Sequence, residues 1–293
     1  MIAHVAQADE QRGRVVLWLG ASGEPHDTAV DAAVRLAQAF HSEIDSLFIE
    51  DGQLFDLADL PFAREISLSG RRTRSFSMDA LAQDMQTHAS ALQRRVLARA
   101  HAADVVAHAR VMRADPVGAL ARACTENGPW NVVTVGAPVR GGDGAGLGGP
   151  GFAELFDAVQ ATTGIVVAGT HARRTAGPVI AVVEDLERLA PMMRAAERIA
   201  RATGGDARLW LLDQPQGHPD WTEGQIRLAL GADPAVALEV VDMTRHTVGD
   251  VAGMMRGQGA GFVISRFGGL LTPTDADAAH FAEQLEGPLF LVR

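Results

Sequence analysis

The sequence predicts an α/β protein made of two doubly wound domains, each with a five-stranded parallel sheet covered by helices. Three observations predict this fold class. The 293 residues suit two domains of ordinary size, short apolar runs alternate with segments of helical period, and the second half repeats the pattern of the first. We expect a first domain at 12–172 and a second, shorter one at 177–293, joined near Arg173–Gly177.

The internal repeat is visible in one helix and two strands. DAAVRLAQAF begins at residue 31 and RAAERIARAT begins 163 positions later, at residue 194, and they share the pattern Ala-Ala-x-Arg-Leu/Ile-Ala-x-Ala. At similar separations, VVLWL (15–19) corresponds to VIAVV (179–183), and SLFIED (46–51) to LWLLD (209–213). Three consecutive elements that correspond in order indicate an internal duplication.

The first half contains five predicted strands. Each is a short apolar run, as expected for a parallel strand that is buried on both faces. They are Val15–Leu19, Ile44–Ile49, Val105–Met112, Asn131–Val135 and Ile165–Ala168.

Helices are predicted between these strands. Apolar residues recur at helical spacing from Val30 to Phe40, and a long helix runs from about Met78 to Ala100. Pro116–Cys124 begins with a proline, which the first turn of a helix tolerates, and Phe152–Gln160 follows. The second half repeats the order more compactly, with strands near 178–183, 207–212, 236–242, 261–265 and 288–292.

One segment, 51–77, has no counterpart in the second half. It combines five large apolar side chains with three arginines, namely Leu54, Phe55, Leu57, Leu60, Phe62, Arg71, Arg72 and Arg74. Either the apolar side chains pack onto their own domain, or they form a partner or dimer surface, because an apolar patch rimmed by arginine suits an interface.

A ligand of such a sheet binds beyond the carboxyl ends of the strands, where the strand order reverses. If the first strand lies beside the fourth, the loops Gly20–His26 and Gly136–Gly151 line that crevice. The second loop has seven glycines between Gly141 and Gly151, which allow backbone amides to surround a phosphate. Arg140 would add charge-assisted hydrogen bonds. The alternative is a flexible loop that binds nothing.

These features together resemble the universal stress protein family. They are a hydrophobic strand that ends in a turn of small residues, the DAAVRLAQAF helix, and a fourth strand that runs into a glycine loop. The resemblance spans both halves, as in a tandem universal stress protein. It implies an adenine nucleotide alpha hydrolase-like fold, pairing through the last strands, and in many members the binding of ATP or AMP.

The chain departs from the nucleotide signature that the family implies, Gly-x2-Gly-x9-Gly followed by Ser or Thr. Gly136 matches the first glycine, but the second position is Val139. The third is Gly149, followed by Pro150, or, counted back from the fifth strand, Gly151, followed by Phe152. Gly20 replaces the acidic residue that ends the first strand in the family. The residues that remain for a nucleotide are Gly20, Ala21, Ser22, Gly136, Arg140, Gly149 and Gly151.

The second half departs further from this pattern. Glu184 and Asp185 follow its first strand, and SRFGGLLTPTD (265–275) follows its fourth. Two carboxylates at the mouth of the crevice would repel a polyphosphate. We expect an ion pair between Arg266 and Glu184 or Asp185, and a purely structural second domain.

Composition excludes several classes of function. The net charge of −10 opposes binding to nucleic acid or anionic lipid. All 26 basic residues are arginine, so Schiff-base, pyridoxal-phosphate and P-loop lysines are excluded. With one cysteine there is no intrachain disulfide. A polar start and no apolar run of 18 residues predict a cytoplasmic chain without membrane insertion.

No catalytic or metal constellation assembles in the sequence. The ten histidines form no H-E-x-x-H motif, and we expect His101 and His108 at the surface. Cys124 is expected to be a small buried hydrophobe. Ser22-Gly23 with Asp27-Thr28 faintly resembles the loop of the N-type ATP pyrophosphatases, but the second glycine is missing and the spacing is one residue longer.

Two functions therefore remain open. One is a non-catalytic, stress-related or regulatory protein that binds a protein partner and whose nucleotide site has eroded. The other is a regulator that binds ATP or AMP on the Gly136–Gly151 loop. The family resemblance also implies self-association through the last strands, Ile165–Ala168 and Leu289–Val292, either between chains or between the two halves of one chain.

Overall fold

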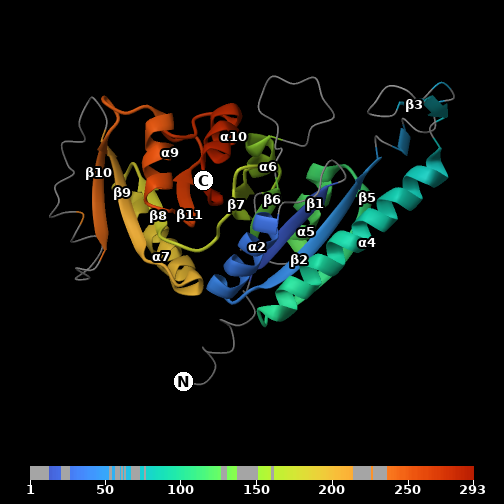
Figure 1. Ribbon diagram of the computed structural model, residues 1–293, viewed down its shortest axis with the longest axis horizontal. Coiled ribbons are helices and arrows are strands. Elements are labelled where there is room, and N and C mark those ends of the chain that lie inside the picture. The colour runs from blue at the N-terminus through green and yellow to red at the C-terminus, as the bar shows by residue number, and fades with distance from the viewer. Residues whose placement is uncertain are drawn as a thin grey trace.

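The computed structural model describes residues 13–20, 27–52, 55–56, 60, 62, 64–66, 73–75, 77–126, 131–136, 151–159, 162–213, 226 and 236–293. Within these residues, ten strands form one sheet in the order β10-β9-β8-β11-β12-β7-β6-β1-β2-β5, with helices on both faces (Figure 1). The predicted α/β class is confirmed. None of the described helices is both long and apolar enough to span a membrane.

The sheet consists of two sets of five parallel strands with the same order. In the first set β1 lies between β2 and β6, and in the second β8 lies between β9 and β11. The first set is β1 (Arg14–Gly20), β2 (Glu43–Asp51), β5 (Ala107–Ala114), β6 (Asn131–Gly136) and β7 (Thr162–Ala168). The second is β8 (Val179–Val183), β9 (Ala207–Asp213), β10 (Ala237–Asp242), β11 (Phe262–Arg266) and β12 (Leu289–Val292).

The two sets join through their last strands. β7 and β12 pair antiparallel, with Val166 opposite Phe290. Each of these strands also has a parallel neighbour on its other side, β6 for β7 and β11 for β12. The predicted pairing of last strands therefore occurs within one chain, and these strands have no free edge for a second copy. The sheet instead ends at β5 and β10.

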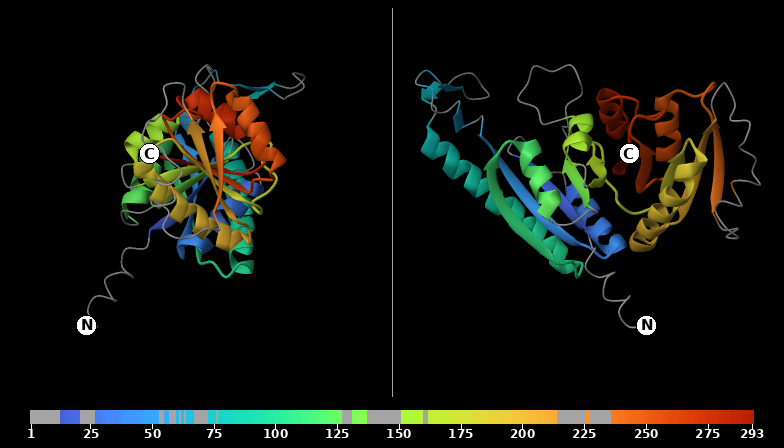
Figure 2. Two further views of the ribbon diagram at one scale, coloured as in Figure 1. Left: turned by 90° about the vertical axis from the view of Figure 1, so that its left-hand side faces the viewer. Right: turned by 180° about the vertical axis from the view of Figure 1, so that it is seen from behind.

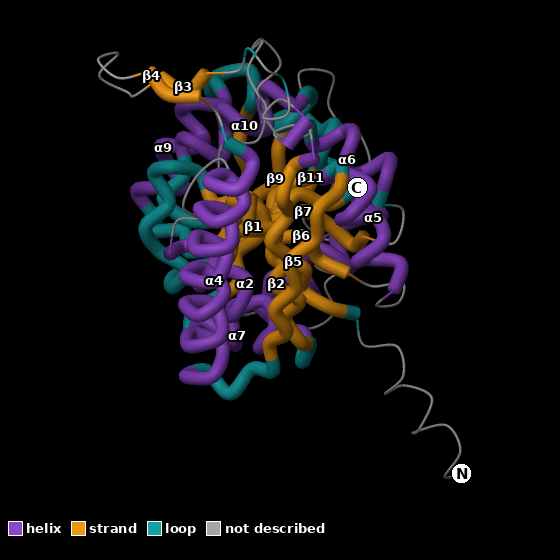
Figure 3. Tube along the Cα trace, turned by 90° about the vertical axis from the view of Figure 1, so that its right-hand side faces the viewer, coloured by secondary structure: helices purple, strands orange, loops and turns teal. Residues whose placement is uncertain are grey.

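Helices divide between the two faces of the sheet (Figure 3). One face is covered by α2 (Asp27–Phe40), α4 (Met78–Ala102) and α7 (Leu186–Thr203). The other is covered by α5 (Pro116–Glu126), α6 (Phe152–Ala158), α9 (Val248–Gly257) and α10 (Asp275–Gln284). Right-handed crossover connections between parallel strands place helices on both faces in this way.

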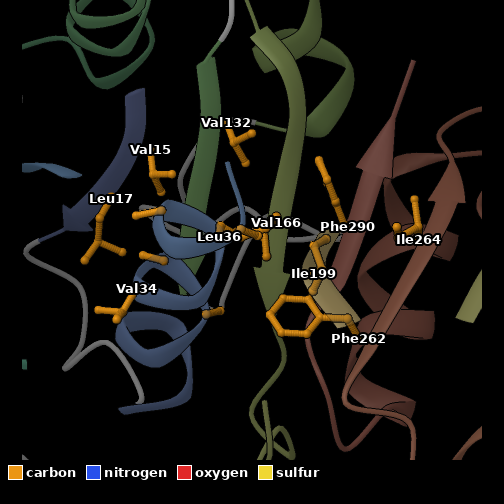
Figure 4. Close-up of a cluster of buried hydrophobic side chains, with 14 of the residues drawn as sticks. Val15, Leu17, Val34, Leu36, Val132, Val166, Ile199, Phe262, Ile264 and Phe290 are labelled. Atoms are coloured by element: carbon orange, nitrogen blue, oxygen red, sulfur yellow. The ribbon is translucent and has the colours of Figure 1, made fainter. Parts of the chain in front are cut away.

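The core continues across the junction of the two sets. Val166 and Phe290 lie in one buried cluster with Leu36 of α2 and Ile199 of α7 (Figure 4). All four side chains are at most 1% exposed. Burial of one large apolar side chain contributes roughly 1.5–3 kcal/mol, so the contact stabilises both halves together.

The 51–77 segment adds a hairpin that the sequence pattern does not reveal. β3 (Arg64–Ile66) pairs antiparallel with β4 (Thr73–Ser75) and belongs to no larger sheet in the described structure. It lies at the end of the molecule remote from the second set of strands (Figure 2). Three residues are too few for a periodicity of two to stand out.

Candidate functional site

The ligand site predicted for the first half would lie where the order of the strands reverses. β1 pairs with both β2 and β6, which meets the condition stated for the predicted site, so Gly20 and Gly136 end neighbouring strands. Gly151 immediately precedes α6. Four of the predicted nucleotide-contacting residues lie outside the described residues, namely Ala21, Ser22, Arg140 and Gly149.

A carboxylate from the second half already lies at the start of α6. The Ala153 N–H donates a hydrogen bond to Oδ1 of Asp275, at 2.9 Å. The same carboxylate lies so close to Gly151 that an added Cβ there would come within 2.5 Å of Oδ2. The N-terminus of a helix attracts anions because its amides are unpaired and its dipole is positive there. Asp275 therefore satisfies one of the otherwise unpaired amides at the start of α6.

Sequence reasoning missed Asp275. It lies 122 residues from Ala153 and is the first residue of α10, whose own N-cap is Thr274. Thr274 followed by acidic residues signals the start of α10, and nothing in that pattern indicates a second role at α6.

The second crevice is also occupied by a side chain of the protein. The Leu270 N–H donates to Oε1 of Glu184 at 2.7 Å. Gly269 permits this approach, because an added Cβ would lie 2.5 Å from the same oxygen. Burial raises the pKa of Glu184, while the hydrogen bond from Leu270 and the charge of Arg266 act to lower it. The glycine-containing loop after β11 therefore binds a carboxylate of the chain.

Asp185 forms the ion pair that the sequence predicts for this crevice. Arg266 Nη1 lies 3.8 Å from Asp185 Oδ2. Asp185 is also the N-cap of α7, where Oδ1 accepts a hydrogen bond from the Arg188 N–H at 2.9 Å. Of the two predicted partners of Arg266, Asp185 makes the ion pair, and Glu184 contributes a longer-range attraction.

Potentially reactive residues of the first half have structural roles. Cys124 is fully buried, and this burial raises the pKa of its thiol to about 12, so the prediction of a small buried hydrophobe is confirmed. His108 is half-exposed and lies 3.0 Å from Glu43. His101 is exposed. Among the described residues, no group of three or more His, Cys, Asp or Glu side chains is placed to hold a metal ion.

Asp27 and Thr28, two residues of the segment that resembles the pyrophosphatase loop, form structural contacts with other parts of the chain. Asp27 pairs with Arg95 at 3.4 Å and Arg99 at 3.7 Å. The Thr28 hydroxyl donates to the carbonyl oxygen of Ala172 at 2.8 Å. Ser22 and Gly23 lie outside the described residues.

The 51–77 segment combines buried and exposed apolar residues. Phe55 is 4% exposed and packs beneath the guanidinium of Arg113, 3.7 Å from its ring centre. Phe62 and Ile66 are 75% and 65% exposed. Phe55 is thus buried, whereas Phe62 and Ile66 are exposed. Several of its predicted contributors lie outside the described residues, either wholly or in their side chains: Leu54, Leu57, Arg71, Arg72 and Arg74.

Solved structures share this arrangement over nearly the whole chain. A universal stress protein from Archaeoglobus fulgidus DSM 4304 superposes with a TM-score of 0.58 at 13% identity, covering 97% of each chain. The chain has a universal stress protein-like fold. A putative universal stress protein from Pseudomonas aeruginosa UCBPP-PA14 gives a TM-score of 0.51 at 13% identity, covering 97% of this chain and 94% of its own.

The same fold also serves a different kind of protein. The cytoplasmic domain of a prokaryotic cation chloride cotransporter matches with a TM-score of 0.51 at 9% identity, covering 96% of this chain and 95% of that one. No family model and no curated protein matches the sequence. At these identities the similarity establishes the fold, and the function has to be argued from the residues of this chain.

Proposed function

We propose that this chain is a non-catalytic regulatory protein of the universal stress type, which acts by binding a protein partner and not by binding a nucleotide. The observation that carries the proposal is the hydrogen bond from the Ala153 N–H to Asp275. A phosphate at the start of α6 would meet this carboxylate, and two anions in one site repel each other.

The second crevice supports the same conclusion. Glu184 accepts the hydrogen bond of the Leu270 N–H, and Asp185 forms an ion pair with Arg266. A polyphosphate would have to displace both carboxylates from cationic and amide partners. We infer that the second half has a structural role in this protein, and that ATP or AMP does not regulate it through either crevice.

The partner surface that we propose is the excursion surface, formed by Leu60, Phe62 and Ile66. These side chains are 40%, 75% and 65% exposed, next to the β3–β4 hairpin. Large exposed apolar side chains close together mark interaction sites more often than chance exposure does.

Cross-linking with mass spectrometry in cells that produce the chain tests this function. We expect one partner to cross-link to the wild-type chain and to the control Val240→Ser, which removes an exposed apolar side chain from β10 at the opposite end of the sheet. We expect the same partner to be lost from the double variant Phe62→Ser/Ile66→Ser. An unchanged cross-link pattern in the double variant would contradict the proposed surface.

A further inference from the structure

A basic groove lies between α7 and the strands β1, β6 and β12. It encloses about 530 Å³, within the range of small-molecule sites. Its walls include Val15, Val132, Met192, Phe290 and Val292, three of which are labelled in Figure 4. Its α7 and α2 residues lie on the face of the sheet that carries these two helices.

The rim of the groove is strongly positive. Within the described part of the chain no Asp or Glu lines it, whereas five arginines do: Arg14, Arg188, Arg194, Arg198 and Arg293. Arg14 and Arg293 already pair with Glu43 and Asp157. The other three therefore determine what the groove attracts.

The three remaining arginines have unused hydrogen-bonding capacity. Arg188 Nε lies 3.7 Å from Asp185, and neither its buried Nε nor its buried Nη1 has a hydrogen-bond partner in the described structure. Arg194 and Arg198 are exposed and form no hydrogen bond or ion pair with any described residue. Because they lie one helical turn apart on α7, their charges repel each other. An anion between them would relieve that repulsion.

The position beside α2 that corresponds, in the internal repeat, to the groove beside α7 is closed. There Ala172 packs against Ala29 and Ala168, and its carbonyl oxygen accepts a hydrogen bond from the hydroxyl of Thr28. In the sequence repeat, Ala29 corresponds to Met192, which lines the groove. Beside α7, none of the described segments closes the groove in this way.

We propose that the groove binds a small amphipathic anion, with one carboxylate head on an aliphatic body, the chemistry of a medium-chain fatty acid. The head pairs with the exposed Arg194 and Arg198, because charge-assisted hydrogen bonds to guanidinium groups are the strongest available there. The aliphatic body lies against the partly exposed apolar residues of the groove, Phe40, Ala195 and Val292. This site is separate from the proposed partner surface and does not depend on it.

Isothermal titration calorimetry of the full chain with decanoate, below the concentration at which it forms micelles, tests the proposal. We expect saturable one-to-one binding of decanoate. We expect affinities at least about tenfold lower for 1-decanol, which lacks the charge, and for acetate, which lacks the body. Absence of saturable decanoate binding, or equal affinity for decanoate and 1-decanol, would overturn the proposal.

Variants place the site in the groove. The charge reversal Arg194→Glu/Arg198→Glu lies on the exposed surface of α7, and we expect it to weaken decanoate binding at least about tenfold. Ala195→Leu narrows the groove and weakens binding without a change in charge. The matched control is Arg201→Glu, on the same helix but outside the groove, where the arginine pairs with Glu197. Equal affinities in the double variant and the control would show that the anion binds elsewhere.

Discussion

Asp275 and Ala153 are joined by a hydrogen bond of 2.9 Å, from the N–H of Ala153 to a carboxylate oxygen of Asp275. Ala153 is in the first turn of α6, in the first half of the chain, and Asp275 begins α10 in the second. One side chain of the second half therefore caps a helix of the first half.

We expect Asp275→Ala to lower the free energy of unfolding by about 1 kcal/mol, the usual cost of losing a side-chain cap. Denaturation in urea measures this change. Glu187→Ala is the control, because Glu187 is also an exposed first-turn carboxylate, on α7, but makes no hydrogen bond with another described residue. Equal effects of the two substitutions would show that the contact with α6 contributes nothing.

Gly164 tests the junction of the two halves. An added Cβ would overlap the ring of Phe290 and the carbonyl oxygen of Leu291 on β12. We expect Gly164→Ala to destabilise the chain by about 1–3 kcal/mol, as overpacking in a core does. Gly257→Ala, where no atom lies within 4 Å of the new Cβ, provides the comparison and is expected to cause no loss. If both variants unfold at the same urea concentration, the β7–β12 contact is not as close as described.

Glu184 predicts a particular dependence of stability on pH. Because burial raises its pKa, its ionisation is less favourable in the folded than in the unfolded state. The wild-type chain therefore has its full advantage in free energy of unfolding over Glu184→Gln below the unfolded pKa of about 4.3. This advantage is lost as the pH rises through the raised pKa of the folded state. Urea denaturation of both proteins between about pH 4 and pH 8 measures this difference. If the free energy of unfolding of the wild-type chain, relative to that of Glu184→Gln, increased with pH, the predicted direction of the dependence would be wrong.

Cys124 is predicted to be inert in the folded chain. Its thiol is buried, and burial with the nearby negative charge of Asp45 raises its pKa to about 12, so almost no thiolate exists at pH 8. We expect a thiol reagent such as dithionitrobenzoate to react with one equivalent only in denaturant. Rapid labelling of the native protein would show that the thiol is accessible.

The order of elements was predictable because each buried parallel strand is a short apolar run with a helix after it. The predicted strand Val15–Leu19 is contained in β1 (Arg14–Gly20), and the predicted start of the long helix at Met78 is the start of α4. The joining of the two strand sets into one sheet depends on the antiparallel contact of Val166 and Phe290. No local pattern records that contact, so it entered only through the family resemblance.

The site was less predictable than the fold. The glycine pattern located the loop ends at Gly136 and Gly151, but it carries no information about what lies opposite them. Asp275 reaches Ala153 only through the tertiary arrangement of α6 and α10. By contrast, Asp185 and Arg266 follow neighbouring strands, β8 and β11, so the rule that carboxyl ends of parallel strands share one edge was sufficient to predict their ion pair.

The most direct measurement of the central claim is a thermal-shift series with ATP, ADP and AMP, each with magnesium, on protein shown by circular dichroism to be folded. A nucleotide at about 100 times its dissociation constant would stabilise the folded chain by about 2.7 kcal/mol, a rise of several degrees. We expect no shift with any of the three. A rise with ATP or AMP that disappears in Gly149→Val would contradict the claim and place a working nucleotide site on the Gly136–Gly151 loop.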